Sequence, residues 1–305
     1  MPHNAFERCL PSSQISSWFV CRLPMNLSQI VVLAVVQGAA ELLPVSSSAH
    51  VIVAEKLMGL DPTSPEMTLL LVMLHTGTMF AVIVYFWTSW RKTYFSSMQA
   101  FRVRGFEILV GTAATGVVGL ALLQLIKQVF AKGAPAFEIE QLFGNAHLMA
   151  GSLAAAGALI LVSSRLDQSA RDDISMRSAV WIGAVQGLCL PFRGFSRSGA
   201  TISTGLAMGV ARRHAEEFSF ALAVVLTPAV IAREGWRLYK AHDALAGSSV
   251  GSLASMLGPS ALGMVLSFAA GLLALRWLSS WLEQGRWYLF GLYCLLASGC
   301  VLVIG

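Results

Sequence analysis

Two short stretches of the chain combine residue types that can bind an anion. The first, residues 37–50, reads QGAAELLPVSSSAH and places Glu41, three consecutive serines and His50 inside an otherwise apolar region. The second, residues 191–201, reads PFRGFSRSGAT and places Arg197 between two serines. An arginine at the centre of a membrane helix costs about 2.5 to 3.5 kcal/mol, so it needs an anion or a water-filled pocket. Its planar guanidinium favours phosphate in particular.

The serine run predicts the start of a short helix. Gln37 and Glu41 are four residues apart, so their side chains share one face of the helix that precedes Pro44. A half-helix that begins near Ser46 would offer hydroxyls and free N–H groups at its positive end, with His50 one turn further on. This pattern predicts an anion site, although serines also act simply as helix caps and a lone histidine is often structural.

The composition is that of a polytopic membrane protein. Of 305 residues, 56% are hydrophobic and 12% are charged, whereas a soluble domain normally carries about 25% charged residues. The net charge of +5 therefore indicates how the loops are oriented across the membrane, and it gives little support to nucleic-acid binding. The five cysteines show no CxxC or metal-binding spacing and are expected to be buried thiols.

The chain is expected to form one all-α membrane domain over residues 26–305, after a disordered N-terminal extension at 1–25. The extension could also reflect start-codon choice, with Met25 as the true start. Two interrupted stretches, 27–60 and 178–210, predict re-entrant hairpins of half-length helices. Six apolar stretches predict full spans at about Thr68–Trp87, Gly105–Ile126, Phe143–Ser163, Phe218–Ala232, Pro259–Leu275 and Trp287–Ile304.

The two hairpins form a weak internal repeat. The triplet Val36-Gln37-Gly38 recurs as Val185-Gln186-Gly187, and a proline and a serine-rich break follow each copy. Three predicted spans separate the hairpins, so they should enter the membrane from opposite faces as an inverted repeat. The two breaks can then meet near the membrane midplane.

The charged loops predict the orientation of the chain, because basic loops stay in the cytoplasm. The side richer in basic residues carries eleven, namely Arg91, Lys92, Arg102, Arg104, Arg165, Arg171, Arg177, Arg212, Arg213, Arg276 and Arg286. The opposite side carries Lys127, Lys132, Arg233, Arg237 and Lys240. Both termini and the opening of the first hairpin should therefore lie outside. Glu216 and Glu217 are interpreted as part of a solvated loop end.

Together the two breaks supply an arginine, hydroxyls, helix N-termini, a histidine and a carboxylate, which predicts a phosphate-binding site. The candidate residues besides Glu41, His50 and Arg197 are Gln37, Ser46, Ser47, Ser48, Ser196, Ser198, Gly199 and Thr201. Because Glu41 alone would repel a phosphate, a bridging Mg²⁺ or Ca²⁺ at Glu41 is expected. Glu41 could instead be a neutral carboxylic acid, or Arg197 could form an interhelical salt bridge with it. His75 is a weaker candidate for contact with the site.

These motifs resemble those of a known family. The segments QxxxE at 37–41, PVSSSAH at 44–50 and GFSRSGAT at 194–201 are similar to the signature motifs of the bacterial undecaprenyl-diphosphatase family linked to bacitracin resistance. The resemblance covers about residue 27 to the C-terminus. It implies a phosphatase of the bacterial inner membrane, with a periplasm-facing site, that converts undecaprenyl diphosphate to the monophosphate and so recycles the lipid carrier of peptidoglycan synthesis. The expected partners are this lipid and the membrane.

The resemblance also implies roles for individual residues. The essential acidic residue, its glutamine partner, the proposed nucleophile, the catalytic histidine and the phosphate-binding arginine correspond to Glu41, Gln37, Ser47, His50 and Arg197. The chain departs from the family pattern in two places: Ala49 stands where glycine is usual, and Arg193-Gly194 replaces Pro-Gly. The second change adds a charge beside the site.

Two mechanisms and two functions fit these residues. Ser47, activated by His50, can attack the terminal phosphorus, or a metal-bound water can attack it with His50 as general base. The alternative function is a polyprenyl-phosphate transporter that uses the same anion site, although a carrier has no need of a nucleophile beside a base. The sequence leaves open the preferred prenyl length and whether the chain forms a homodimer.

Overall fold

The computed structural model describes residues 26–61, 64–130, 145–166, 173–192, 194–244 and 253–304, and every element of this described part is a helix. The helices are α1 (Leu27–Leu42), α2 (Ser47–Leu57), α3 (Pro65–Thr93), α4 (Met98–Phe130), α5 (Ala146–Leu166), α6 (Met176–Cys189), α7 (Arg197–Ala207), α8 (Arg212–Ala244), α9 (Leu253–Glu283) and α10 (Trp287–Ile304). The predicted N-terminal extension and Arg193 lie outside the described residues.

Five helices, α3, α4, α5, α8 and α9, are long and apolar enough to cross a membrane. They confirm five of the six predicted spans, and the sixth is α10, a shorter apolar helix of 18 residues. Large apolar side chains point outward from these helices, for example Phe106, Leu109 and Val117 on α4, which are 54%, 62% and 69% exposed. Soluble monomers rarely expose so much apolar surface. The chain is therefore an all-α polytopic membrane protein.

The two interrupted stretches form hairpins, as predicted. Helices α1 and α2 contain 16 and 11 residues, and α6 and α7 contain 14 and 11. Since each residue adds about 1.5 Å, none of the four helices spans a hydrocarbon core of about 30 Å. The tips of the hairpins touch, because the Ser198 hydroxyl donates a hydrogen bond to the carbonyl oxygen of Leu43 at 3.2 Å. The two breaks thus meet.

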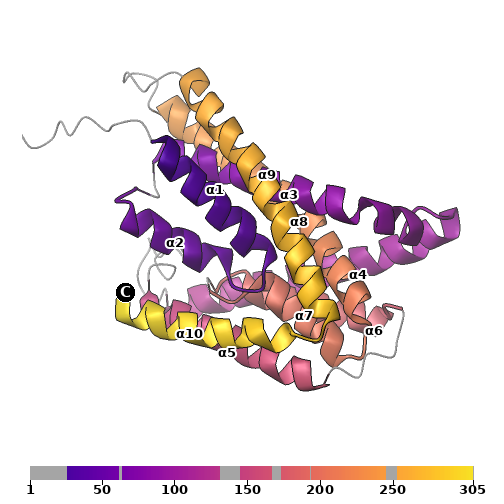
Figure 1. Cartoon of the computed structure of the whole chain (residues 1–305). Coiled ribbons are helices and arrows are strands. Elements are labelled where there is room, and N and C mark those ends of the chain that lie inside the picture. The colour runs from indigo at the N-terminus through magenta and orange to yellow at the C-terminus, as the bar shows by residue number, and fades with distance from the viewer. Residues whose placement is uncertain are drawn as a thin grey trace, which may run out of the picture.

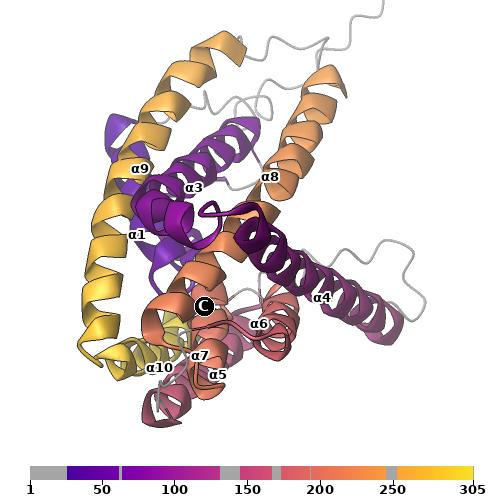
Figure 2. The ribbon, with the colours of Figure 1, turned by 90° about the vertical axis from the view of Figure 1, so that its right-hand side faces the viewer.

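The helix contacts repeat in the two halves of the chain. Helix α1 packs along α9, and α6 packs along α4 in the corresponding way, while α3 contacts α8 and α5 contacts α10 across the halves. Figure 1 shows α5 and α10 side by side below the first hairpin. Figure 2 shows α4 extending away from the rest of the molecule. An odd number of helices, α3 to α5, separates the hairpins, which is the arrangement of an inverted repeat.

The packing of α6 on α4 positions the second hairpin. The two backbones approach closely, since a Cβ atom added to Gly183 would lie 2.0 Å from the carbonyl oxygen of Gly111. The Thr115 hydroxyl bonds both backbones, at 2.9 Å from the Gly111 oxygen and 2.8 Å from the Gly183 oxygen. Glycine at the contact therefore holds α6, and the break that comes after it, against α4.

The start of α8 corrects one prediction. Glu216 and Glu217 do not belong to a solvated loop end, because each is 3% exposed. Helix α8 already begins at Arg212, and it packs against α3, α7 and α9. Glu216 accepts a hydrogen bond from Ser279 at 2.6 Å, and Glu217 accepts one from Arg213 at 2.9 Å. Buried carboxylates need such partners.

Candidate active site

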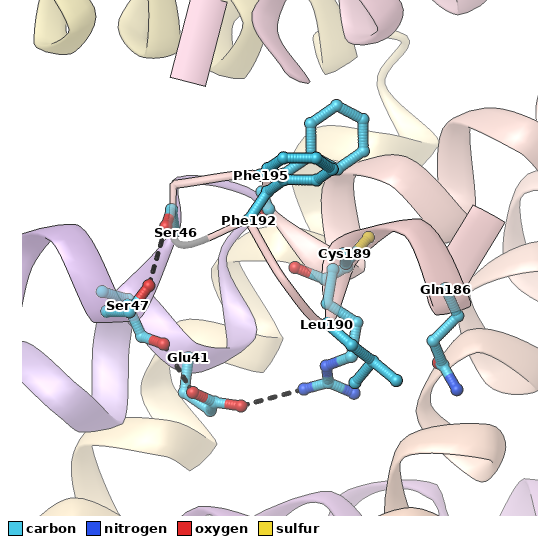
Figure 3. A pocket seen from close by; sticks show the side chains of 13 residues that line it. Glu41, Ser46, Ser47, Gln186, Cys189, Leu190, Phe192 and Phe195 are labelled. Carbon is cyan, nitrogen blue, oxygen red and sulfur yellow. Dashed lines mark hydrogen bonds and ion pairs between the residues drawn. The ribbon is translucent and has the colours of Figure 1, made fainter. Parts of the chain in front are cut away.

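A cavity of about 210 Å³ lies where the two breaks meet. Figure 3 shows its walls, with Glu41, Ser46 and Ser47 on one side and Gln186 and Cys189 on the other. The remaining lining residues are Ala40, Ser48, Leu190, Phe192, Phe195, Ser196, Arg197 and Ser198. The volume is below the roughly 300 to 1,000 Å³ of pockets that enclose a drug-sized ligand. It suits a polar head group better than a whole lipid.

Glu41 is the centre of a hydrogen-bond network in this cavity. Its Oε1 accepts a hydrogen bond from Arg197 Nη2 at 3.0 Å. Its Oε2 accepts hydrogen bonds from the Ser47 hydroxyl at 2.6 Å and from Gln37 Nε2 at 3.2 Å. The prediction that Gln37 and Glu41 share a helix face is confirmed. The salt bridge that was the alternative interpretation of Arg197 is also present.

His75 contacts the same carboxylate from α3. Its Nδ1 donates to the carbonyl oxygen of Leu71 at 2.8 Å, and its Nε2 lies 3.8 Å from Glu41 Oε2. The sequence made His75 only a weak candidate, because no local pattern indicates that α3 packs against α1. The structure brings it to the edge of the site.

Two helix N-termini converge on the cavity. Helix α2 begins at Ser47, and the side chain of its N-cap residue, Ser46, makes no capping hydrogen bond. The first N–H groups of a helix lack partners within the helix, so those of α2 can bind an anion. Helix α7 begins at Arg197, and there the Ser196 hydroxyl accepts a hydrogen bond from the Gly199 N–H at 3.2 Å. The first terminus is the more open of the two.

The structure does not bring His50 to the Ser47 hydroxyl. His50 Nδ1 lies 2.7 Å from the Ser46 carbonyl oxygen, which can only accept, so Nδ1 carries the hydrogen. Nε2 then accepts a hydrogen bond from the Tyr293 hydroxyl at 2.6 Å, and the two rings stack with centroids 5.7 Å apart. Both ring nitrogens are thus occupied, while Ser47 donates to Glu41 instead.

Ser46 has a left-handed backbone, with φ of 66°. This conformation costs a non-glycine residue about 1 to 3 kcal/mol, and the hydrogen bond from His50 to the Ser46 carbonyl offsets part of that cost. Tyr293 supports His50 in turn. Sequence reasoning missed Tyr293, since it is 243 positions from His50 and nothing in the local sequence of α10 marks it.

Four candidate residues lie beside the cavity rather than on its walls. Gln37 and His50 act on Glu41 and Ser46 as described. Thr201 is fully buried, donates to the Arg197 carbonyl oxygen at 2.8 Å, and lies 2.5 Å from the Ser219 hydroxyl. A Cβ atom on Gly199 would lie 3.2 Å from Pro44 Cβ, so Gly199 lets the two breaks touch.

Fold and site together define a class of protein. It is a polytopic helical membrane protein in which two hairpins bring a carboxylate, a serine hydroxyl and a guanidinium together between apolar helices. The chain belongs to the family described as Bacitracin resistance protein BacA, which matches residues 30–300. The family resemblance of the sequence motifs is thereby confirmed.

Curated relatives cover most of the chain. It is 65% identical over 280 residues to undecaprenyl-diphosphatase 2 of Acinetobacter baylyi, an alignment that covers 92% of this chain and 98% of that protein. It is 35% identical to undecaprenyl-diphosphatase of Desulfosudis oleivorans, with coverage of 92% and 99%. It is 33% identical to undecaprenyl-diphosphatase of an Anaeromyxobacter species, with coverage of 92% and 88%.

Proposed function

We propose that this chain is an undecaprenyl-diphosphatase, which hydrolyses undecaprenyl diphosphate to undecaprenyl phosphate and inorganic phosphate. One observation carries the proposal: the Ser47 hydroxyl lies 2.6 Å from the Glu41 carboxylate in a cavity that also contains Arg197. The names of the relatives agree with this chemistry. The transporter alternative is not favoured, because carriage does not require a hydroxyl held against a proton acceptor.

The terminal phosphate binds between Arg197 and the start of α2. Arg197 Nη2 is bonded to Glu41, while Nη1 is buried without a partner among the described residues. A buried charged donor needs an acceptor, and a phosphate oxygen supplies one in the geometry that guanidinium prefers. The open N–H groups of α2 bind further oxygens. Head-group binding therefore uses both hairpins.

Ser47 is the nucleophile in the first of two steps. Its oxygen bonds to the terminal phosphorus as the bridging P–O bond breaks, the electron pair leaves with undecaprenyl phosphate, and the hydroxyl proton passes to Glu41. Water then attacks the phosphoserine, the serine oxygen takes back a proton, and inorganic phosphate leaves. Ser47→Ala should lose at least about a thousandfold in kcat, because the nucleophile is removed. Substantial turnover by that variant would establish direct attack by water instead.

His50 is a positioning residue in this scheme. It holds the Ser46 carbonyl through Nδ1 and is held by Tyr293 through Nε2. Its contribution is to keep the backbone at Ser46 in the conformation that directs the next hydroxyl, that of Ser47, toward Glu41. The proton acceptor for Ser47 is thus Glu41 rather than the imidazole.

A divalent cation, Mg²⁺ or Ca²⁺, binds together with the substrate. No group of three or more acidic, histidine or cysteine side chains suited to a metal occurs in the described part of the chain. Glu41 provides one carboxylate, and Mg²⁺ commonly binds through one or two carboxylates plus substrate phosphates. The residues fit a cation of this kind. When bound, it neutralises negative charge on the diphosphate.

The protein resides in the bacterial inner membrane with its site open to the periplasm. The support is the distribution of basic residues, which concentrates at the ends of α3, α5, α7 and α9 and predicts that these ends are cytoplasmic. In this orientation α1 and α2 open outward, so a lipid diphosphate in the outer leaflet reaches the cavity. The partners are this lipid and the surrounding membrane.

The test is phosphate release from undecaprenyl diphosphate by purified protein in detergent. Wild type should release phosphate, and EDTA, Glu41→Ala or Arg197→Ala should abolish release. Arg91→Ala, which removes an exposed arginine at the end of α3, is the charge-matched control and should retain activity. Absence of release from folded wild-type protein would overturn the proposal, and transport of a lipid phosphate across vesicles would then support the alternative.

A further inference from the structure

Gln186 is the counterpart, in the second hairpin, of Gln37 in the first. It lies in the wall of the cavity across from Glu41 and Ser47, as Figure 3 shows, and is only 1% exposed. The two glutamines differ in the residue that stands four positions later in the chain. Gln37 donates to Glu41, but the corresponding position in the second hairpin is Leu190. Gln186 therefore lacks the carboxylate partner, four residues later in the chain, to which Gln37 donates.

The orientation of the Gln186 amide is set by Thr115. The Thr115 hydroxyl has one hydrogen, which it directs to the carbonyl oxygens of Gly111 and Gly183 at 2.9 and 2.8 Å. Its oxygen can therefore only accept from a further partner, and Gln186 Nε2 lies 3.3 Å away as the donor. The amide oxygen of Gln186 must then face elsewhere.

That oxygen, Gln186 Oε1, is buried and has no hydrogen-bond partner among the described residues. A buried acceptor without a donor costs about 1 to 3 kcal/mol. Arg197 lines the same cavity, and its Nη1 is a buried donor without an acceptor in the described part of the chain. A ligand that satisfies both atoms must offer an acceptor to Arg197 and a donor to Gln186.

A phosphate group meets this requirement in one protonation state. A fully ionised terminal phosphate offers only acceptors, and its oxygens would face the lone pairs of Gln186 Oε1. A singly protonated terminal phosphate offers both P–O⁻ and P–OH. We propose that Gln186 accepts a hydrogen bond from the P–OH group of the terminal phosphate, so that the site binds the singly protonated form of its substrate. This inference rests on the proposed diphosphatase function.

The proposal predicts a pH-dependent difference between wild type and Gln186→Met, which keeps the length of the side chain but has no amide. The second pKa of a phosphate monoester is about 6. The ratio of the variant's KM for undecaprenyl diphosphate to that of wild type should be about tenfold below this pH, where P–OH is present. It should fall toward one about two pH units higher, where P–OH is lost. The ratio cancels pH effects common to both proteins.

A second variant and a control variant complete the test. For Gln186→Glu, the ratio of the variant's KM to that of wild type should rise with pH instead of falling. The reason is that an ionised carboxylate repels the phosphate. Thr112→Val is the matched control. Thr112 lies on α4 three residues before Thr115, and its hydroxyl is also buried without a partner among the described residues. It should retain the wild-type profile. Thermal unfolding in detergent verifies that each variant is folded.

The outcomes separate this inference from the function on which it rests. A KM ratio for Gln186→Met that is independent of pH would overturn the role of Gln186 while leaving the diphosphatase intact. So would a Thr112→Val profile that matches that of Gln186→Met, since a buried water network would then explain both. Failure of wild type to release phosphate would overturn the function itself.

Discussion

Arg197 serves two partners with one side chain. Its Nη2 bonds Glu41 at 3.0 Å, and its Nη1 is directed to the phosphate in the proposed function. Lysine has a single ammonium group and cannot present two parallel donors in the same way. Each of these donors thus depends on the guanidinium fork.

Replacement of Arg197 by lysine should therefore lower kcat/KM by about a hundredfold, the effect of losing one preorganised donor at a developing negative charge. The measurement is steady-state phosphate release, with Arg91→Lys as the control for a general arginine-to-lysine effect. Near-wild-type turnover by Arg197→Lys would show that positive charge alone suffices.

His50 offers a second prediction at the residue scale. If it positions the Ser46 carbonyl, asparagine should substitute well, because its side-chain amide can donate from nearly the same place as Nδ1. His50→Asn should lose about two- to tenfold in kcat, the effect of a weakened hydrogen bond, whereas His50→Ala should lose much more. A general base would behave differently: both variants would lose about a hundredfold or more.

Tyr293→Phe belongs to the same test. It removes the hydroxyl that bonds His50 Nε2 and retains the stacked ring. Its loss should match that of His50→Asn rather than that of His50→Ala. The three kcat values together distinguish positioning from proton transfer.

The residue types of the site could be read from the sequence, but only some of their pairings could. The helix spacing of Gln37 and Glu41 predicted their contact, because both residues lie within one helix. The spacing of Ser47 and His50 suggested a similar pair, yet the imidazole bonds a backbone carbonyl of its own turn. Tyr293 arrives from α10 through tertiary packing, which no local pattern encodes.

Helices α4 and α6 depend on glycine for their close approach. Gly183→Ala would place a methyl group 2.0 Å from the Gly111 carbonyl oxygen, so the helices must separate. Overpacking of this kind costs about 1 to 3 kcal/mol. The variant should lower the thermal unfolding temperature in detergent, and it should also lower activity because α6 carries the second break.

Gly116→Ala, on the partner helix α4, is the matched control. A Cβ atom at Gly116 meets no atom of the described residues within 4 Å, and alanine favours a helix over glycine by up to about 1 kcal/mol. It should leave the unfolding temperature unchanged or raise it. Equal destabilisation by the two variants would contradict the role assigned to the α4–α6 contact.

The sequence predicted the helices and the two breaks between half-helices well. Hydrophobic runs predicted the helices, and the prolines and serines predicted both breaks, because membrane helices must satisfy their own backbone. The burial of Glu216 and Glu217 near the start of α8 was not predicted. Its charged residues Arg212, Arg213, Glu216 and Glu217 suggest solvent, but the two carboxylates also accept hydrogen bonds from other helices, from Ser279 on α9 and Ser89 on α3.

The whole molecule has an orientation that labelling can test. In a variant without its five native cysteines, Lys127→Cys at the exposed end of α4 should react with a membrane-impermeant maleimide in spheroplasts. Ser96→Cys, in the exposed turn between α3 and α4, should react only after lysis. The reverse pattern would place the cavity on the cytoplasmic side and contradict the charge rule for this chain.

The ion pair between Arg197 and Glu41 has a consequence for the lipid surroundings of the protein. With no ligand bound, Glu41 offsets the charge of Arg197, so the guanidinium attracts a passing anion less strongly than an unpaired arginine would. Most phospholipid head groups carry their phosphate as a diester with a single negative charge, a weak competitor for a guanidinium already matched to a carboxylate. A diphosphate brings more charge and an exposed terminal group. The cavity can therefore select a lipid diphosphate over the phosphodiester lipids that surround the protein.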